Sequence, residues 1–235
     1  MGEKSSALIE PRRDSHPFQP CEWYKLAQLR RFEGEIMHNR QVDPSLSATM
    51  RVQTWAKPWN EELRPLKVLA DHKALSDDDE FCWTPDGAAD FNIRITTGET
   101  IKIQSTMAYP EWEGGVGKQG GHVYKLEMIA FNKDGYSYPG GLVTAPRARS
   151  AYDDVEACRR GIIKALQNKL RPEYAGCYLL IFAPRFGFHT IDFDFAQVIA
   201  PAIEQVGKAE WEHVFEGLWV CDDYSFFEAR RSPEK

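Results

Sequence analysis

The clearest pattern in the chain is an alternation of apolar and polar residues in the segment 85–106. A period of two residues is typical of a β-strand that buries one face. Two alternating runs flank residues 96–99, where Gly98 is free to adopt a positive φ, so the segment predicts two paired strands joined by a tight turn. The apolar row of this hairpin consists of Phe91, Ile93, Ile95, Ile101 and Ile103.

The opposite face of the same hairpin carries candidate chemistry. Because side chains alternate across a sheet, Asp90, Lys102 and Gln104 should lie together on the polar face. An acid, a lysine and an amide that converge on neighbouring strands indicate a chemical site or the remnant of one. A register shifted by one residue would bury Lys102 and expose the isoleucines, so that alternative is disfavoured.

A helical period predicts the first helix from Cys21 to about Asn39. Its apolar stripe consists of Trp23, Leu26, Leu29, Ile36 and Met37. Glu33 falls near the middle of this stripe, whereas Glu35 falls on the opposite side. A buried carboxylate without a partner costs several kcal/mol, so Glu33 should pair with an arginine, lie where the face is shallow, or belong to a site.

The segment 41–75 contains three prolines and predicts a loop, a short helix and a first strand. The acidic run 77–80 predicts a solvated turn. Further on, the glycine-rich segment 109–122 contains G-x-G-x-x-G, but no strand runs directly into it and two glutamates precede it. These features argue against a dinucleotide site and favour a flap or hairpin tip, followed by a strand at 122–131 and a turn at 132–135.

The second half of the chain alternates helices and strands. A helix is expected from Asp153 to about Leu170, with Lys169 beside its apolar stripe as a lysine that extends to solvent. The continuous apolar run Tyr178–Phe182 predicts a strand buried on both faces. A helix at 196–206 and a strand at 212–220 follow, and Asp192 and Asp194 fit a water-facing strand or a helix cap.

This order of helices and strands predicts an α/β protein with three layers, α/β/α, and a central sheet of mixed direction. The chain has 235 residues, of which 43% are hydrophobic, and this is enough for one domain. We expect a polar, proline-containing tail or extended lead-in at residues 1–20 and a single domain over residues 21–235.

Charge, cysteine content and the absence of certain motifs bear on the protein's partners, location and chemistry. A formal charge of −6 gives no overall basic field that would attract nucleic acid, although it leaves room for a local basic groove. The five cysteines are scattered, and no signal-peptide pattern is present, so a reducing, cytoplasmic location is expected. No apolar run is long enough to span a membrane. The histidines show no metal-ligand spacing, and no G-x-S-x-G nucleophile elbow is present.

The hairpin with Pro85-Asp86, Asp90 and the run Lys102-Ile103-Gln104, followed by the helix and buried strand of residues 157–183, resembles the PD-(D/E)XK, or restriction-endonuclease-like, nuclease superfamily. The resemblance covers roughly residues 21–220. It implies a core of a helix, a three-strand meander, a helix and a strand. It also implies an acid on the second strand, and an acid and a lysine two residues apart on the third.

The chain departs from that pattern on the third strand. Lys102 stands where the resemblance expects a carboxylate, and Gln104 stands where it expects lysine, a position at which some members carry glutamine. The resemblance implies Mg²⁺ or Mn²⁺ as cofactor, with Asp90, Glu33 and the backbone carbonyl of Ile103 as ligands. Lys102 and Gln104 would then contact the scissile phosphate, so the catalytic set is Asp90, Lys102, Gln104 and Glu33.

Two functions remain open at this point. The first is a metal-dependent nuclease that hydrolyses phosphodiester bonds, with DNA favoured over RNA by the resemblance. The second is a nuclease fold without catalysis that binds nucleic acid or a protein partner, including another copy of itself. Exposed aromatic residues would suit the second function, and arginines could contact phosphates in either. The aromatic residues are Trp55, Trp59 and Trp112, and the arginines are Arg30, Arg31, Arg147, Arg149, Arg159 and Arg160.

Overall fold

The computed structural model describes residues 18–42, 62–85, 87–111, 137–138, 141–142, 151–183 and 195–232. The helices are α1 (Leu26–Val42), α4 (Arg64–His72), α6 (Ala151–Lys169), the short 3₁₀ helix η3 (Pro172–Tyr174), α7 (Phe195–Val206) and α8 (Lys208–Glu212). The strands are β1 (Trp23–Lys25), β2 (Glu80–Trp83), β3 (Phe91–Arg94), β4 (Thr100–Met107), β5 (Ser137–Tyr138), β6 (Gly141–Leu142), β7 (Cys177–Phe182), β8 (Phe215–Cys221) and β9 (Phe226–Arg230).

The centre of the molecule is a seven-stranded sheet of order β1-β2-β3-β4-β7-β8-β9. Strands β1 to β4 form an antiparallel meander, β4, β7 and β8 run parallel to one another, and β9 is antiparallel to β8. Parallel neighbours need a crossover connection, and helices α6 and α7 lie in the two crossovers. The α/β class and the mixed sheet expected from the sequence are therefore confirmed.

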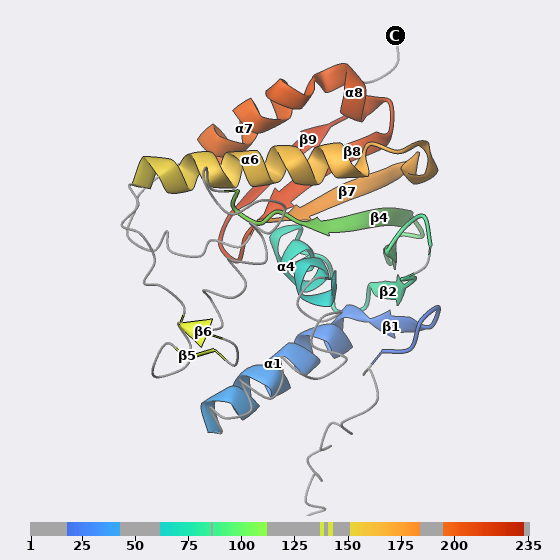
Figure 1. Ribbon diagram of the computed structural model, residues 1–235. Coiled ribbons are helices and arrows are strands. Elements are labelled where there is room, and N and C mark those ends of the chain that lie inside the picture. Colours follow the sequence, from blue (N-terminus) through green and yellow to red (C-terminus); the bar gives the residue numbers. More distant parts are fainter. Residues whose placement is uncertain are drawn as a thin grey trace, which may run out of the picture.

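Helices cover both faces of the sheet, as Figure 1 shows. Helices α1 and α4 pack on one face, in a core with apolar side chains of β2, β3 and β4. Helices α6 and α7 pack on the other face, against β7 and β8. The first core includes Leu26, Leu29, Leu66, Leu69, Phe81, Phe91, Ile93 and Ile103, and the second includes Ile162, Leu166, Ile199, Ile203, Phe215 and Val220.

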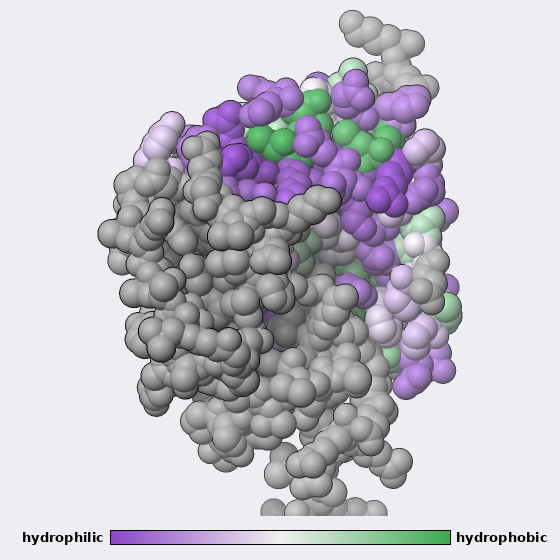
Figure 2. All heavy atoms as spheres, in the orientation of Figure 1, coloured by the Kyte–Doolittle hydropathy of each residue, from purple (hydrophilic) through white to green (hydrophobic). Residues whose placement is uncertain are grey.

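Strand β7 separates these two cores. Leu180 and Phe182 belong to the α1–α4 core, whereas Leu179 and Ile181 belong to the α6–α7 core. Both faces of the strand are thus buried, as the continuous apolar run predicts. The outer surface over α6, α7 and α8 is mainly hydrophilic, with small apolar areas (Figure 2). Among the described helices, none combines the length and the apolar character that crossing a bilayer requires.

Several element boundaries differ from the prediction. The helix expected from Cys21 begins at Leu26, because Trp23–Lys25 pairs with Glu80–Cys82 as an edge strand. The short helix expected within 41–75 is α4, but the strand expected in that segment lies after it, as β2. Strand β9 was not expected, and its membership in the sheet comes from pairing with β8.

The acidic run 77–80 is only partly a solvated turn. Asp77 and Asp78 are exposed, but Asp79 is 2% exposed, and its carboxylate accepts hydrogen bonds from the backbone N–H groups of Ser76 and Thr96. Apart from residues 109–111, the expected flap at 109–122 lies outside the described residues. The same holds for the expected strand at 122–131, the turn at 132–135, and Asp192 and Asp194.

The segment that leaves β4 is fixed against α6 by a close backbone approach. A Cβ atom at Gly161 would lie 2.1 Å from the carbonyl oxygen of Tyr109. The same contact is reinforced by the N–H of Glu111, which donates to the Ala157 carbonyl at 2.8 Å, and by Arg160 Nε, which donates to the Glu111 carbonyl at 2.8 Å. Glycine at position 161 therefore lets the crossover helix lie directly on the chain that follows β4.

Gly161→Ala should destabilise the fold, because the added methyl group meets backbone rather than a flexible side chain. We expect the free energy of unfolding to fall by about 1–3 kcal/mol in urea titration. The matched control is Gly34→Ala in α1, where nothing lies within 4 Å of the new Cβ. That helix-interior change should stabilise by about 0.5–1 kcal/mol. Equal effects of the two variants would contradict the close approach.

Candidate functional site

Asp90 lies immediately before β3. Its carboxylate extends the hydrogen bonding between β3 and β4 beyond the end of β3. Its backbone carbonyl accepts a hydrogen bond from the N–H of Thr84 at 2.8 Å. Its Oδ2 accepts from the backbone N–H of Ser105 at 2.8 Å and from Gln104 Nε2 at 2.5 Å. The carbonyl of Ala89, which would face Ser105 in a continued ladder, instead accepts a hydrogen bond from the Thr84 hydroxyl. The second carboxylate oxygen of Asp90, Oδ1, accepts no hydrogen bond from the described residues.

Gln104 is buried beside Asp90 with half of its amide unused. It is 2% exposed, and its Nε2 donates to Asp90 and, at 3.3 Å, to the Ser105 carbonyl. Its Oε1 is buried without a hydrogen-bond partner among the described residues. An unsatisfied buried acceptor costs about 1–3 kcal/mol, which indicates that a donor or a cation belongs at this position.

Lys102 extends from the same face of β4. The register pairs it with Asn92 and Ile103 with Phe91, so Asp90, Lys102 and Gln104 share a face as the alternation predicts. Lys102 is exposed, and its charge acts on the thiol of Cys177 at the start of β7. The structure therefore brings together three of the four predicted catalytic residues.

Lys169, the last residue of α6, is a third charged group at this place. Its ammonium lies 5.2 Å from the centre of the Tyr174 ring and is electrostatically coupled to Asp90. Burial lowers the pKa of Lys169, and the charge of Asp90 opposes this effect. From the sequence, Lys169 was expected to extend to solvent. Its position beside the apolar stripe of α6, rather than opposite it, was the available signal.

Burial also dominates the electrostatics of Asp90. It raises the pKa of the carboxyl group, while the hydrogen bond from the Ser105 N–H and the charge of Lys169 act in the opposite direction. The folded protein thus holds the Asp90 proton more tightly than the unfolded chain does. The stability associated with this group is largest below its ordinary pKa of 3.8 and declines as the pH rises from there through the raised value.

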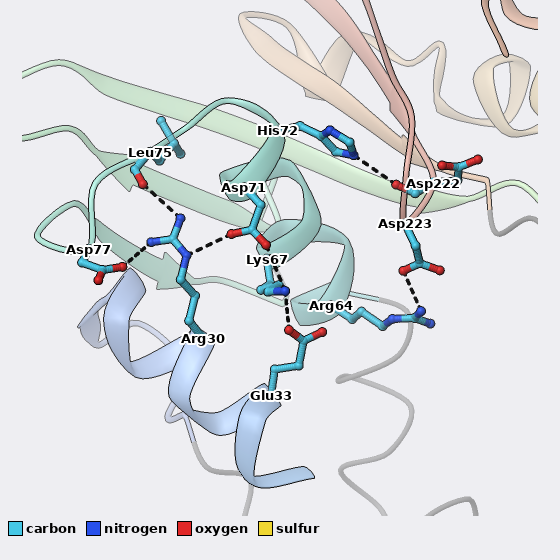
Figure 3. Close-up of polar contacts among 10 residues, drawn as sticks. All are labelled: Arg30, Glu33, Arg64, Lys67, Asp71, His72, Leu75, Asp77, Asp222 and Asp223. Atoms are coloured by element: carbon cyan, nitrogen blue, oxygen red, sulfur yellow. Dashed lines mark hydrogen bonds and ion pairs between the residues drawn. The ribbon is translucent and has the colours of Figure 1, made fainter. Parts of the chain in front are cut away.

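Glu33 lies elsewhere. Figure 3 shows its side chain pointing from α1 to Lys67 of α4, with which it forms an ion pair, and Lys67 Nζ also lies 2.9 Å from Asp71. Helices α1 and α4 cover the face of the sheet opposite to Asp90 and Gln104. The expected partner of Glu33 therefore exists, as a lysine rather than an arginine, and the structure does not bring Glu33 to Asp90.

Ile103 has its side chain fully buried in the α1–α4 core. Residue 103 pairs with Phe91 on β3 and with Tyr178 on β7, so its carbonyl oxygen lies in the plane of the sheet. Residue 103 lies between Lys102 and Gln104 on β4. Of the three expected metal ligands, Asp90 belongs to the cluster formed by Asp90, Lys102, Gln104 and Lys169, hereafter the Asp90 cluster, Ile103 adjoins it, and Glu33 lies on the opposite face of the sheet.

The arginines considered as phosphate contacts have intramolecular partners where the structure describes them. Arg30 binds Asp71, Asp77 and the Leu75 carbonyl, as Figure 3 shows. Arg31 pairs with Glu35, Arg159 contacts Glu156 and Gln205, and Arg160 donates to the Glu111 carbonyl. Arg147, Arg149, Trp55, Trp59 and Trp112 lie outside the described residues.

The oxygen atoms of the Asp90 cluster suit a hard cation in part. Within the described ranges, no three His, Cys, Asp or Glu side chains form a metal-binding group. Mg²⁺, however, is often held by one or two carboxylates together with water and substrate phosphate. Asp90 and the unpartnered Oε1 of Gln104 can supply two oxygens. The charges of Lys102 and Lys169 oppose a bare cation but favour a cation that arrives with phosphate.

No family model, curated protein or solved structure matched the chain when it was compared with them.

Glu33→Gln tests the assignment of that residue to the interface between helices α1 and α4. Its pair with Lys67 is mostly buried, with side chains 23% and 20% exposed, but Lys67 keeps Asp71 as a partner, so we expect the free energy of unfolding to fall by about 1–3 kcal/mol. Mn²⁺ affinity, measured by calorimetry, should stay at the value of the unmodified protein. Glu35→Gln, which alters a surface pair on the same helix, is the control. A selective loss of Mn²⁺ affinity in Glu33→Gln would show that Glu33 is a metal ligand after all.

Asp90→Asn should stabilise the protein at neutral pH, because it removes a carboxylate whose charged form is disfavoured by burial. We expect Tm at pH 7 to rise by about 2–4 °C, which corresponds to roughly 1 kcal/mol for a chain of this size. The gain should vanish below about pH 4, where the carboxyl group is protonated in both states. Asp78→Asn, at an exposed ion pair with Lys25, should show no such gain. A pH-independent loss of stability in Asp90→Asn would contradict this account.

Proposed function

We propose that the chain has a restriction-endonuclease-like core and acts as a divalent-metal-dependent nuclease of the cytoplasm that hydrolyses phosphodiester bonds, in DNA rather than RNA. The order of elements supports this proposal. Among the described elements, α1 and then α4 precede the antiparallel strands β2, β3 and β4, and α6 and β7 follow after the short strands β5 and β6, with β7 parallel to β4. This is the order of helix, three-strand meander, helix and strand that the resemblance implies.

The observation that carries the proposal is the hydrogen-bonded pair of Asp90 and Gln104, with a buried amide oxygen that has no partner among the described residues. A protein stabilised only by its core would gain by replacing this pair with apolar residues. A carboxylate whose pKa burial raises, next to an unused acceptor and two lysines, is more typical of a site that binds a charged ligand.

Asp90 and Gln104 would hold the metal ion, which when bound lowers the pKa of a water molecule and neutralises charge on the phosphate. Asp90 must be ionised for this role, so activity should rise with pH through its raised pKa. Lys102 is exposed on the same face and would contact the phosphate that carries the scissile bond. The hydrogen bonds from Ser105 and Gln104 fix the orientation of the carboxylate.

A second function, nucleic-acid binding without hydrolysis, is favoured by one specific observation. Lys102 occupies the position on β4 where the resemblance expects a second carboxylate, and Glu33, which could have replaced that carboxylate, is ion-paired on the opposite face of the sheet. In this case the Asp90 cluster would keep the phosphate-binding lysines of a nuclease and lack its full metal-binding set.

The two functions are separated by incubating the protein with plasmid DNA, single-stranded DNA and RNA in Mg²⁺ or Mn²⁺. For a nuclease, we expect metal-dependent cleavage that falls by about 100-fold or more in Asp90→Asn, because several kcal/mol of charge stabilisation are lost. Asp78→Asn, at an exposed surface pair, is the matched control and should cleave at the original rate.

Cleavage that survives Asp90→Asn unchanged would contradict the site. Binding to nucleic acid without cleavage in any of these metals would select the second function.

A further inference from the structure

Lys169 is a half-buried charge that makes no ion pair with any described residue. The other lysine of α6 behaves differently. Lys164, five residues earlier on the same helix, is 54% exposed and lies 2.5 Å from Glu111. A lysine at a helix C-terminus is favoured by the helix dipole, but that preference does not require burial. Its partly buried position therefore needs a reason beyond the end of α6.

The position of Lys169 is fixed by the chain that follows it. Its ammonium lies over the ring of Tyr174 in η3, at 5.2 Å from the ring centre. Helix η3 leads through Gly176, which has a φ of +77°, into β7 at Cys177. Cys177 in turn approaches the carbonyl of Ala88, two residues before Asp90, at 4.0 Å. The end of α6 is thus held next to the segment that positions Asp90.

Lys169 and Asp90 are coupled electrostatically but do not touch. Each acts on the other's charge, yet they form no direct ion pair. Gln104, which donates to Asp90, has a buried oxygen without a partner among the described residues. A carboxylate and an ammonium that act on each other without an ion pair can both be contacted by one ligand, directly or through a cation.

We propose that Lys169 binds a phosphate of the nucleic acid beside Asp90, and so supplies from α6 the lysine that β4 lacks at Gln104. The inference rests on the proposed function only for the identity of the ligand. In this arrangement the cation site and the phosphate site are adjacent. Asp90 and Gln104 face the cation, while Lys169 and Lys102 face the negative oxygens from α6 and β4 respectively.

The test uses Lys169→Met, which keeps an apolar stem of similar length and removes the charge. Binding of fluorescently labelled single-stranded and duplex DNA is measured by anisotropy in Ca²⁺ and in EDTA, over a range of salt. We expect Kd to rise about tenfold, since a charge-assisted contact to phosphate is lost. The slope of log K against log salt should decrease by about one. Lys169→Arg should retain most of the affinity.

Lys208→Met is the control, because Lys208 lies on α8, is 63% exposed and pairs only weakly with Glu212 at 3.5 Å. Its affinity for DNA should equal that of the unmodified protein. An unchanged Tm in Lys169→Met would show that the loss of DNA affinity comes from the missing charge and not from a destabilised fold. Lys169→Gln, in the same assay, replaces Lys169→Met if the latter does not fold.

The inference is overturned if Lys169→Met, or its replacement, binds DNA as tightly as the unmodified protein. It is also overturned if the unmodified protein does not bind DNA. Loss of affinity in this variant, combined with no cleavage by the unmodified protein in any metal, would support the phosphate position while rejecting hydrolysis. Failure of the proposed function and failure of the inference are therefore distinguishable.

Discussion

The structure depends on the pairing of β4 with strands of opposite direction on its two sides. On one side β4 closes the antiparallel meander through β3, and on the other it pairs in parallel with β7. The parallel partner requires a crossover, which α6 provides, and α6 can lie close to the end of β4 because residue 161 is glycine. Helix α6 ends at Lys169. The constraint that builds the sheet thus also brings a lysine to the polar face of the hairpin.

The sheet itself decides which charged residues can meet. Its two faces are separated by a continuous layer of backbone and apolar side chains, so a helix on one face cannot supply a ligand to the other. Glu33 on α1 therefore pairs with Lys67 on α4, whereas Asp90 shares its face with Gln104 and the end of α6. Glu33 therefore does not supply a carboxylate to the face of the sheet that carries Asp90.

The Asp90 cluster is costly for stability. Burial disfavours the charged form of Asp90, Lys169 is partly desolvated, and an oxygen of Gln104 is buried without a described partner. Each feature lowers the free energy of unfolding relative to a simple apolar face. Their coincidence on one small area, between strands that are otherwise well packed, is the pattern expected where a binding site has been retained at the expense of stability.

The sequence by itself determined the local geometry of the hairpin and much of the sheet. A period of two residues is a property of the strand alone, so the alternation placed Asp90, Lys102 and Gln104 on one face, and the continuous apolar run of β7 required burial on both faces. Interactions between distant segments decided the rest. The edge strand β1 exists because Trp23–Lys25 pairs with Glu80–Cys82, and no local periodicity records that pairing. The partner of Glu33 and the approach of Lys169 to Asp90 depend on which face each helix covers, and that is fixed only when both cores pack.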